Sequence, residues 1–308
     1  MKTTFGQAVA QVNRMAMNYH DETLPVAEMK FHDLDRMAIA GQGVEVLPSA
    51  QRLFCNRLAV PHSYLSRCSA DLQAANLNYW LELEKGQRDT FFCRFDGDRL
   101  RAVFTDRYKA LDNREIVGKM MDYGFSPDAE VHLVLSPDLM VLKVPDYARA
   151  FQIEKDKLTP GIAVSNSEVG ILAFSIEAYF YRLVCTNGMI SKTEVASKFR
   201  HVSVRALEEF PDIVRQVIYE SRYNQERLAI TADRRIDNPA STIESFNRRF
   251  LVTRKEAEAV SRAYGLEPGP TMFHVINSYT RAAQDSGLSG EESNKLERIG
   301  GQILALVK

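Results

Sequence analysis

The sequence predicts an α+β fold, with a central antiparallel sheet, flanking helices and a helical C-terminal third. Between about residues 90 and 184, apolar and polar residues alternate in short runs separated by turn residues, which is typical of β-strands. From about residue 203, apolar residues recur at spacings of three and four, which is typical of helices. We therefore expect an α+β core domain over residues 1–236 and a C-terminal helical region over residues 237–308.

The first part of the chain predicts a mixed lead-in followed by a helical stretch. We expect a short helix over residues 5–17 and an extended piece at residues 44–47. Residues 49–85 show helical spacing, with Ser49 as a cap and a break at Pro61, because proline disfavours helical backbone in the residue before it. We interpret the first twenty residues of this stretch as a plain helical hairpin, with a helix-turn-helix as the alternative.

The middle of the chain predicts two hairpins, a helix and a third pair of strands. Turn residues at 96–98 and 136–139 each separate two strand-like runs. A helix is expected over residues 113–123, between the hairpins. The third pair consists of residues 161–164 and 171–184, whose alternation is the longest of all.

The long strand has two different faces. Its apolar residues share one parity and are expected to face the core. The other parity carries Ser175, Glu177, Tyr179 and Tyr181. We expect this polar and aromatic face either to contact solvent or to form a binding surface.

The C-terminal third carries signals for the beginnings and ends of helices. Three capping-box patterns, in which Ser or Thr precedes Glu by three residues, predict helix starts at Ser241, Thr253 and Ser289. Gly265 and Gly287 occupy positions where helix C-caps are expected.

The overall composition is that of an ordinary globular protein. The 308 residues are 45% hydrophobic and 26% charged, which excludes collagen-like, disordered and disulfide-scaffold proteins. The formal net charge is −1. A nucleic-acid site would therefore have to be a local basic patch, because overall charge does not attract a polyanion.

The sequence predicts a cytoplasmic protein without a membrane partner. No apolar run approaches the length needed to span a bilayer, and the N-terminus lacks the apolar segment of a signal peptide. The four cysteines are far apart and form no CxxC pair, so we expect reduced thiols.

Motifs for cofactors, metals and nucleophilic catalysis are missing from the sequence. There is no HExxH, GxSxG, GxGxxG or GxxxxGK[ST] pattern. The nearest approach to a ligand cluster is His32 with Asp33 and Asp35, which a solvated acidic turn explains equally simply. We therefore expect no cofactor and no metal, and catalytic residues stay unassigned.

Basic and aromatic residues are interleaved in two groups, and such groups can bind phosphates and stack bases. The candidate nucleic-acid-binding residues are Arg99, Arg101, Arg107, Tyr108, Lys109, Tyr179, Tyr181, Arg182, Lys198 and Arg200. Several aspartates lie among the first group, so a neutralised, solvated face is an equally simple explanation.

Five segments together resemble one family: residues 104–113, 165–170, 181–189, 200–203 and 275–284. They are similar to the phage/plasmid-like proteins grouped as domain of unknown function 932, over roughly residues 45–290. The resemblance implies a setting on phages, plasmids or integrated elements, among genes for DNA metabolism. It implies no catalytic residues, because no activity is settled for that family.

These observations leave three functional hypotheses. The first is a protein that binds nucleic acid, single-stranded DNA in particular, in recombination, repair or replication, with homo-oligomers as a further expectation. The second is a metal-dependent enzyme acting on nucleic acid through Glu168, Glu177 or the Asp33 and Asp35 pair. The third is a mobile-element protein that binds and modulates a host protein.

Overall fold

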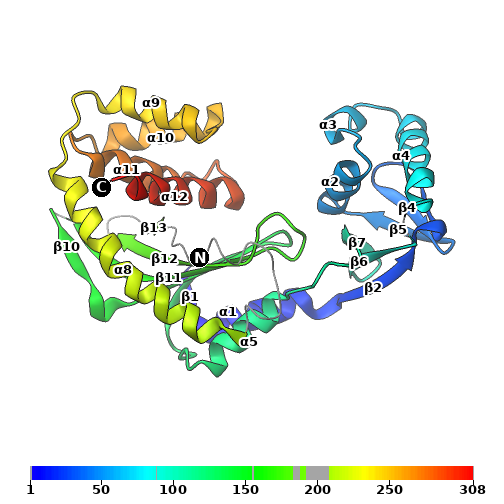
Figure 1. The fold of residues 1–308 in the computed structure, drawn as a ribbon, viewed down its shortest axis with the longest axis horizontal. Helices are drawn as coiled ribbons and strands as arrows, with labels where there is room; N and C mark the ends of the chain where they lie inside the picture. The colour runs from blue at the N-terminus through cyan, green and yellow to red at the C-terminus, as the bar shows by residue number, and fades with distance from the viewer. Residues whose placement is uncertain (1, 88, 155, 183–187, 192–207, 308) are drawn as a thin grey trace.

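The chain folds into two lobes, each built on its own β-sheet (Figure 1). The computed structural model describes residues 2–87, 89–154, 156–182, 188–191 and 208–307. We call residues 19–104 the small lobe and the remaining described residues the large lobe. Both lobes combine a sheet with packed helices, so the α+β fold class is confirmed. The structure has two sheets, however, where we expected a single central one.

The small lobe carries a six-stranded sheet in the order β2-β6-β7-β5-β4-β3. β5 and β7 pair in parallel, and the other neighbours are antiparallel. Its elements are β2 (Tyr19–Pro25), β3 (Met29–Phe31), β4 (Arg36–Ile39), β5 (Gln42–Val46), α2 (Pro48–Arg57), α3 (His62–Leu65), α4 (Ala70–Lys85), β6 (Thr90–Asp96) and β7 (Arg99–Phe104), with short 3-10 helices at Ala16–Asn18 and Val26–Glu28.

The small lobe has a complete apolar core of its own. Phe54 of α2 packs edge-on against Phe31 and lies next to Phe91. α2 begins one residue earlier than expected, because Pro48 occupies the first helical position, where its missing N–H is no loss. α3 spans a single turn, which is too short for the recognition helix of a helix-turn-helix.

The N-terminal lead-in contains more structure than its sequence predicts. Within residues 2–47 the chain forms five strands, whereas only the piece at residues 44–47 was expected to be extended. The missed strands are short or lie at sheet edges, where alternation of apolar residues is weak.

The large lobe carries a seven-stranded antiparallel sheet in the order β1-β8-β9-β11-β12-β13, with β10 paired to β11. Its strands are β1 (Lys2–Thr4), β8 (Glu130–Leu135), β9 (Met140–Pro145), β10 (Phe151–Ile153), β11 (Asp156–Asn166), β12 (Ser175–Arg182) and β13 (Gly188–Ser191), with a 3-10 helix at Tyr147–Arg149. Gly161 lets β11 approach β9 closely, because a Cβ there would lie 2.2 Å from the Val144 carbonyl oxygen.

Helices cover both faces of this sheet. α1 (Phe5–Met15), α5 (Asn113–Asp122) and α8 (Phe210–Asp233) bury one face around Phe5, Ile116 and Phe210. The opposite side carries α9 (Pro239–Arg249), α10 (Arg254–Leu266), α11 (Met272–Ala282) and α12 (Gly290–Ala305), as Figure 1 shows.

The C-terminal helices share a core with the sheet. One apolar cluster joins Leu228 of α8, Phe180 of β12 and residues of α9 to α12. The expected boundary between residues 236 and 237 falls between α8 and α9, inside the stretch of chain that builds this cluster. The two apolar cores instead separate the small lobe from the large lobe.

Two of the three predicted helix starts are confirmed. Thr253 and Ser289 form complete capping boxes. The prediction for Ser241 is wrong, because Asn238 caps α9 three residues earlier. Neither glycine is a C-cap: α10 continues past Gly265 to its end, and Ala283 caps α11.

Candidate functional site

Arg99 and Arg101 lie on β7, yet only Arg99 is at the surface. Both line a cavity of about 250 Å³ between the lobes, so they share a face as their parity predicts. Arg101 is 2% exposed, and its Nη2 donates to Glu168 Oε2 at 2.6 Å. Arg99 has a half-exposed side chain that pairs with Asp96. The expectation of two free guanidinium groups is therefore wrong for this strand.

The predicted second group is buried inside the large lobe. Tyr179 is 0% exposed and Tyr181 is 7% exposed, beneath α12. Lys143 lies over the Tyr179 ring and pairs with Glu297 of α12. Burial raises the pKa of Tyr179 well above its usual value. These tyrosines cannot stack on bases, because the protein's own helix occupies the face that we expected to be open.

Arg182 is also neutralised internally. Its guanidinium group pairs with Asp156 at 2.7 Å and with Glu267 at 2.6 Å. Lys198 and Arg200 lie outside the described residues. Among the candidates that the structure does describe, the two groups lie on different sheets and form no common trough.

Arg107, Tyr108 and Lys109 lie in the segment that joins the lobes, between β7 and α5. The Tyr108 ring stacks on Phe104 with 3.8 Å between centroids and 7° between planes. A Cβ on Gly170 would lie 3.1 Å from the Phe104 ring, so the large lobe backs this stack. Arg107 and Lys109 are exposed and have no ion-pair partner among the described residues. We call Phe104, Arg107, Tyr108 and Lys109 the junction platform.

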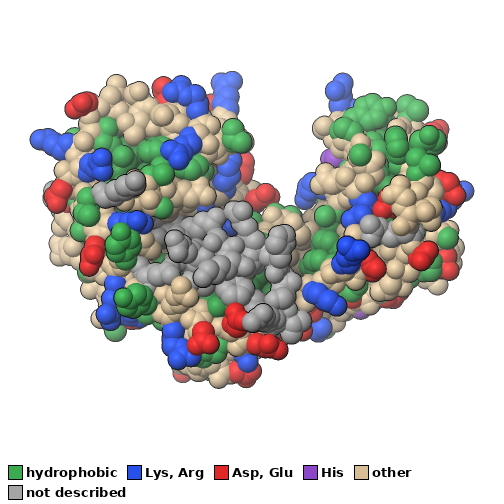
Figure 2. Space-filling model, in the orientation of Figure 1, with side chains coloured by type: hydrophobic (Ala, Val, Ile, Leu, Met, Phe, Trp, Pro, Cys, Tyr) green, Lys and Arg blue, Asp and Glu red, His purple; other side chains and the backbone are tan. Residues whose placement is uncertain are grey.

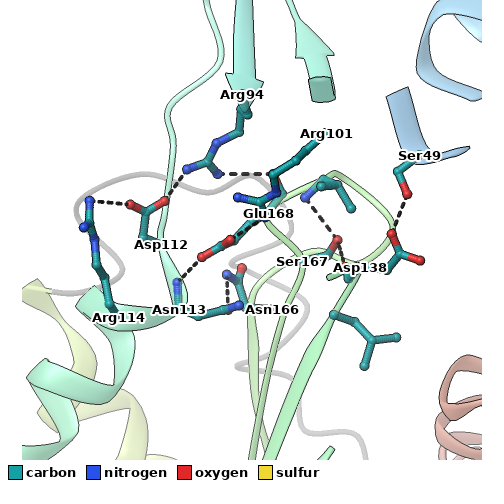
Figure 3. A network of polar contacts seen from close by, with 12 residues as sticks. Ser49, Arg94, Arg101, Asp112, Asn113, Arg114, Asp138, Asn166, Ser167 and Glu168 are labelled. Atoms are coloured by element: carbon teal, nitrogen blue, oxygen red, sulfur yellow. Dashed lines mark hydrogen bonds and ion pairs between the residues drawn. The ribbon is translucent and has the colours of Figure 1, made fainter. Parts of the chain in front are cut away.

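Beneath the platform lies a buried polar network, shown in Figure 3. Arg94 is 2% exposed and bonds to Asp21, to Asp112 and to the Glu168 carbonyl oxygen. Glu168 Oε1 accepts from the backbone N–H of Asn113 at 2.7 Å. We call Arg94, Arg101, Asp112, Asn113 and Glu168 the junction network, because its members come from both lobes.

Electrostatics favours the charged forms in this network. Burial disfavours the charged form of Arg94, but hydrogen bonds and charges from Asp21 and Asp112 outweigh it and raise the pKa of Arg94. Burial also raises the pKa of Tyr108. The phenol of Tyr108 therefore stays neutral at physiological pH.

A second set of bonds ties the loop between β11 and β12 to its surroundings. Ser167 Oγ donates to the Asp138 carbonyl oxygen at 2.6 Å and accepts from the Ile171 N–H at 3.0 Å. Ser49 donates to the Asp138 carboxylate from the small lobe. Figure 3 shows these residues beside the junction network. The loop is thereby held by side chains from three separate parts of the chain.

The carboxylates considered as metal ligands all have other partners. Asp33 pairs with Arg36, Glu177 with Arg298 and Glu168 with Arg101, and Asp35 accepts from Gln51. Across the described parts of the chain, no three His, Cys, Asp or Glu side chains gather closely enough to hold a metal ion.

The sequence gave only indirect signals of the junction network. Asp112–Asn113 fits a helix start, and the structure confirms a capping box at Asp112. The burial of Arg94 and the partner of Glu168 have no local signal, because 74 residues separate the two. Two of the segments on which the family resemblance depends, residues 104–113 and 165–170, meet in this network.

Comparison with known proteins gives one match. Neither the curated proteins nor the solved structures contain a protein that matches this chain. Among the helices that the structure describes, none is long and apolar enough to cross a membrane. A family model matches residues 102–299, well over half of the sequence, and includes Asp112, Asn113 and Glu168 of the junction network. The chain therefore belongs to the DUF932 family, whose description is a domain of unknown function.

Proposed function

We propose that this protein binds single-stranded nucleic acid, DNA in particular, where its two lobes meet. The observation that carries the proposal is the junction platform: a partly exposed aromatic stack between two exposed cations without ion-pair partners among the described residues. Figure 2 supports this location, because the surface is hollowed between the lobes and Lys and Arg side chains border the hollow.

The platform has the chemistry that a single strand requires. An exposed base can stack on Tyr108, whose ring is held parallel to Phe104 before any ligand arrives. Stacking of a base on an aromatic side chain contributes about 1–3 kcal/mol. Arg107 and Lys109 flank the ring in the sequence and can contact the phosphates on either side of the base.

The structure narrows the set of contact residues that the sequence predicted. Arg101, Tyr179, Tyr181 and Arg182 are buried and act within the fold. Arg99 is half exposed and can exchange its partner Asp96 for a phosphate. We accordingly assign the first contacts to Arg107, Tyr108 and Lys109.

Fluorescence anisotropy with a labelled single-stranded oligonucleotide tests this proposal. We expect binding at about 50 mM salt that weakens steeply towards about 200 mM, since released counterions drive binding to phosphates. The double variant Arg107→Ala/Lys109→Ala should flatten the dependence of log K on log salt by about 1.4, or about 0.7 per lost phosphate contact. Tyr108→Leu should weaken binding at both salt concentrations.

The matched control is Arg149→Ala/Arg215→Ala, which removes two exposed arginines from other parts of the large lobe. This control should bind like the unaltered protein. Equal losses in both double variants, or no binding by the unaltered protein at low salt, would contradict the proposal. Cleavage of the oligonucleotide after addition of Mg²⁺ would favour the enzyme hypothesis instead.

A further inference from the structure

A cavity of about 780 Å³ opens on the large lobe, between helices and the loop that joins β11 to β12. The N-terminal ends of α10 and α12 border it, and Figure 1 shows both ends directed towards the small lobe. Its volume lies within the range of about 300–1,000 Å³ that is usual for small-molecule sites. No step of the proposed function uses this cavity so far.

The lining of the cavity is apolar with one unmatched polar atom. Leu172, Phe250 and Ile299 contribute apolar and aromatic surface. Asn294 also lines the cavity and is only 6% exposed, and its Oδ1 is buried without a hydrogen-bond partner. A buried acceptor without a donor is unfavourable by about 1–3 kcal/mol. A ligand that brings an N–H group to Asn294 would remove this penalty.

The charges around the cavity are largely matched within the protein. Lys295 pairs with Glu256 at 2.7 Å and Arg298 pairs with Glu177. Glu292 takes part in the capping box of α12 and pairs with Lys255 at 2.8 Å. The remaining acid, Glu291, is exposed at the rim. A neutral ring therefore fits the interior better than a charged group does.

The cavity is connected to the junction platform by a short piece of chain. Gly170 contacts the Phe104 ring on the platform side, and Leu172 lines the cavity two residues later. Two residues span at most about 7 Å. A strand whose base stacks at the platform can thus place a nearby base at the cavity.

We propose that the cavity binds a nucleobase of the bound strand, which contacts Phe250 and donates a hydrogen bond to Asn294 Oδ1. A base is a flat, neutral ring with N–H donors at its edge, which matches the apolar lining and the unmatched acceptor. Its sugar and phosphates remain outside, on the side of the platform. This inference rests on the proposed function and adds base contact to it.

Two variants and one control test the cavity in the full-length protein. Asn294→Leu removes the amide at similar size, and Leu172→Trp places a ring inside the cavity. Leu266→Trp is the control, because Leu266 is 68% exposed at the other end of α10. Circular dichroism first establishes that each variant is folded.

Saturation-transfer NMR with free deoxyadenosine and deoxycytidine reports on the cavity alone, and anisotropy reports on the strand. We expect both nucleosides to bind the unaltered protein and the control. Asn294→Leu and Leu172→Trp should abolish nucleoside binding and weaken oligonucleotide binding about tenfold.

The outcomes separate the two proposals. Oligonucleotide binding by the unaltered protein without nucleoside binding, or equal binding in all variants, would overturn the base-binding cavity and leave the platform intact. Nucleoside binding that only the two cavity variants lose, without oligonucleotide binding, would support the cavity and overturn the proposed function.

Discussion

Arg101 shows how a single buried charge fixes the contact between the lobes. Its guanidinium carbon lies 3.3 Å from the Tyr19 ring centroid, and Glu168 from the large lobe takes one of its hydrogen bonds. The Nε and Nη1 atoms are buried and have no partner. Because a buried cation is costly without a carboxylate beside it, Glu168 is required where Arg101 is present.

Removing one member of this pair should destabilise the protein much more than removing both. We expect Glu168→Ala to lower the free energy of unfolding by about 3–5 kcal/mol, since it leaves the Arg101 charge buried alone. Arg101→Met/Glu168→Leu should recover most of this loss. Arg99→Ala, at the surface, should change it by at most about 1 kcal/mol. Urea unfolding measures all three; a double variant as unstable as Glu168→Ala would refute this interpretation.

Among the helices, α9 shows why a capping pattern can mislead. Asn238 precedes Pro239, and its side chain accepts from the Ser241 N–H at 3.0 Å. Proline at the first helical position fixes the backbone there, so the helix begins before the Ser241 pattern. Ser241 is then an ordinary first-turn residue.

The two candidate caps of α9 should differ in stability when each is replaced. Asn238→Ala should lower the free energy of unfolding by about 1 kcal/mol, because the Ser241 N–H loses its acceptor. Ser241→Ala should stay within about 0.5 kcal/mol of the unaltered protein, as most surface substitutions do. Thermal unfolding of both variants decides between them; an equal loss would mean that Ser241 also caps.

The strand β12 illustrates a second limit at the scale of elements. Alternation along it correctly predicts a strand with one apolar face. Its polar and aromatic face is buried as well, because Arg298 of α12 bonds to Ser175 and Glu177. Polar residues on one face indicate an exposed surface only when no other element brings matching polar groups.

At the scale of the whole molecule, the lobes differ in how the chain builds their cores. All the buried residues of the small-lobe core lie between Val26 and Val103. The core between the sheet and α1, α5 and α8 draws on residues from Phe5 to Val217, and the C-terminal helices add a further cluster. The large lobe therefore needs nearly the full chain, whereas the small lobe needs one continuous segment.

A fragment of residues 16–106 should therefore fold alone. We expect a cooperative thermal transition and dispersed amide signals in NMR, because the complete small-lobe core is present. Arg94 and Arg101 would lose Asp112 and Glu168 but gain water at the newly exposed surface. Phe54→Ala should abolish the transition, since loss of a buried Phe costs about 3–5 kcal/mol. An unfolded fragment would show that the junction network is required for folding.

The sequence by itself determined the α+β class, the hairpin at β6 and β7, the hairpin at β8 and β9, and two helix caps. These features depend on neighbouring residues, whose periodicity and turn chemistry are local. Only the tertiary structure decided that Arg101 pairs with Glu168, 67 residues away, and that α12 covers Tyr179. The physical reason is that a charge or a face is free or buried according to what packs against it, and no local pattern carries that information.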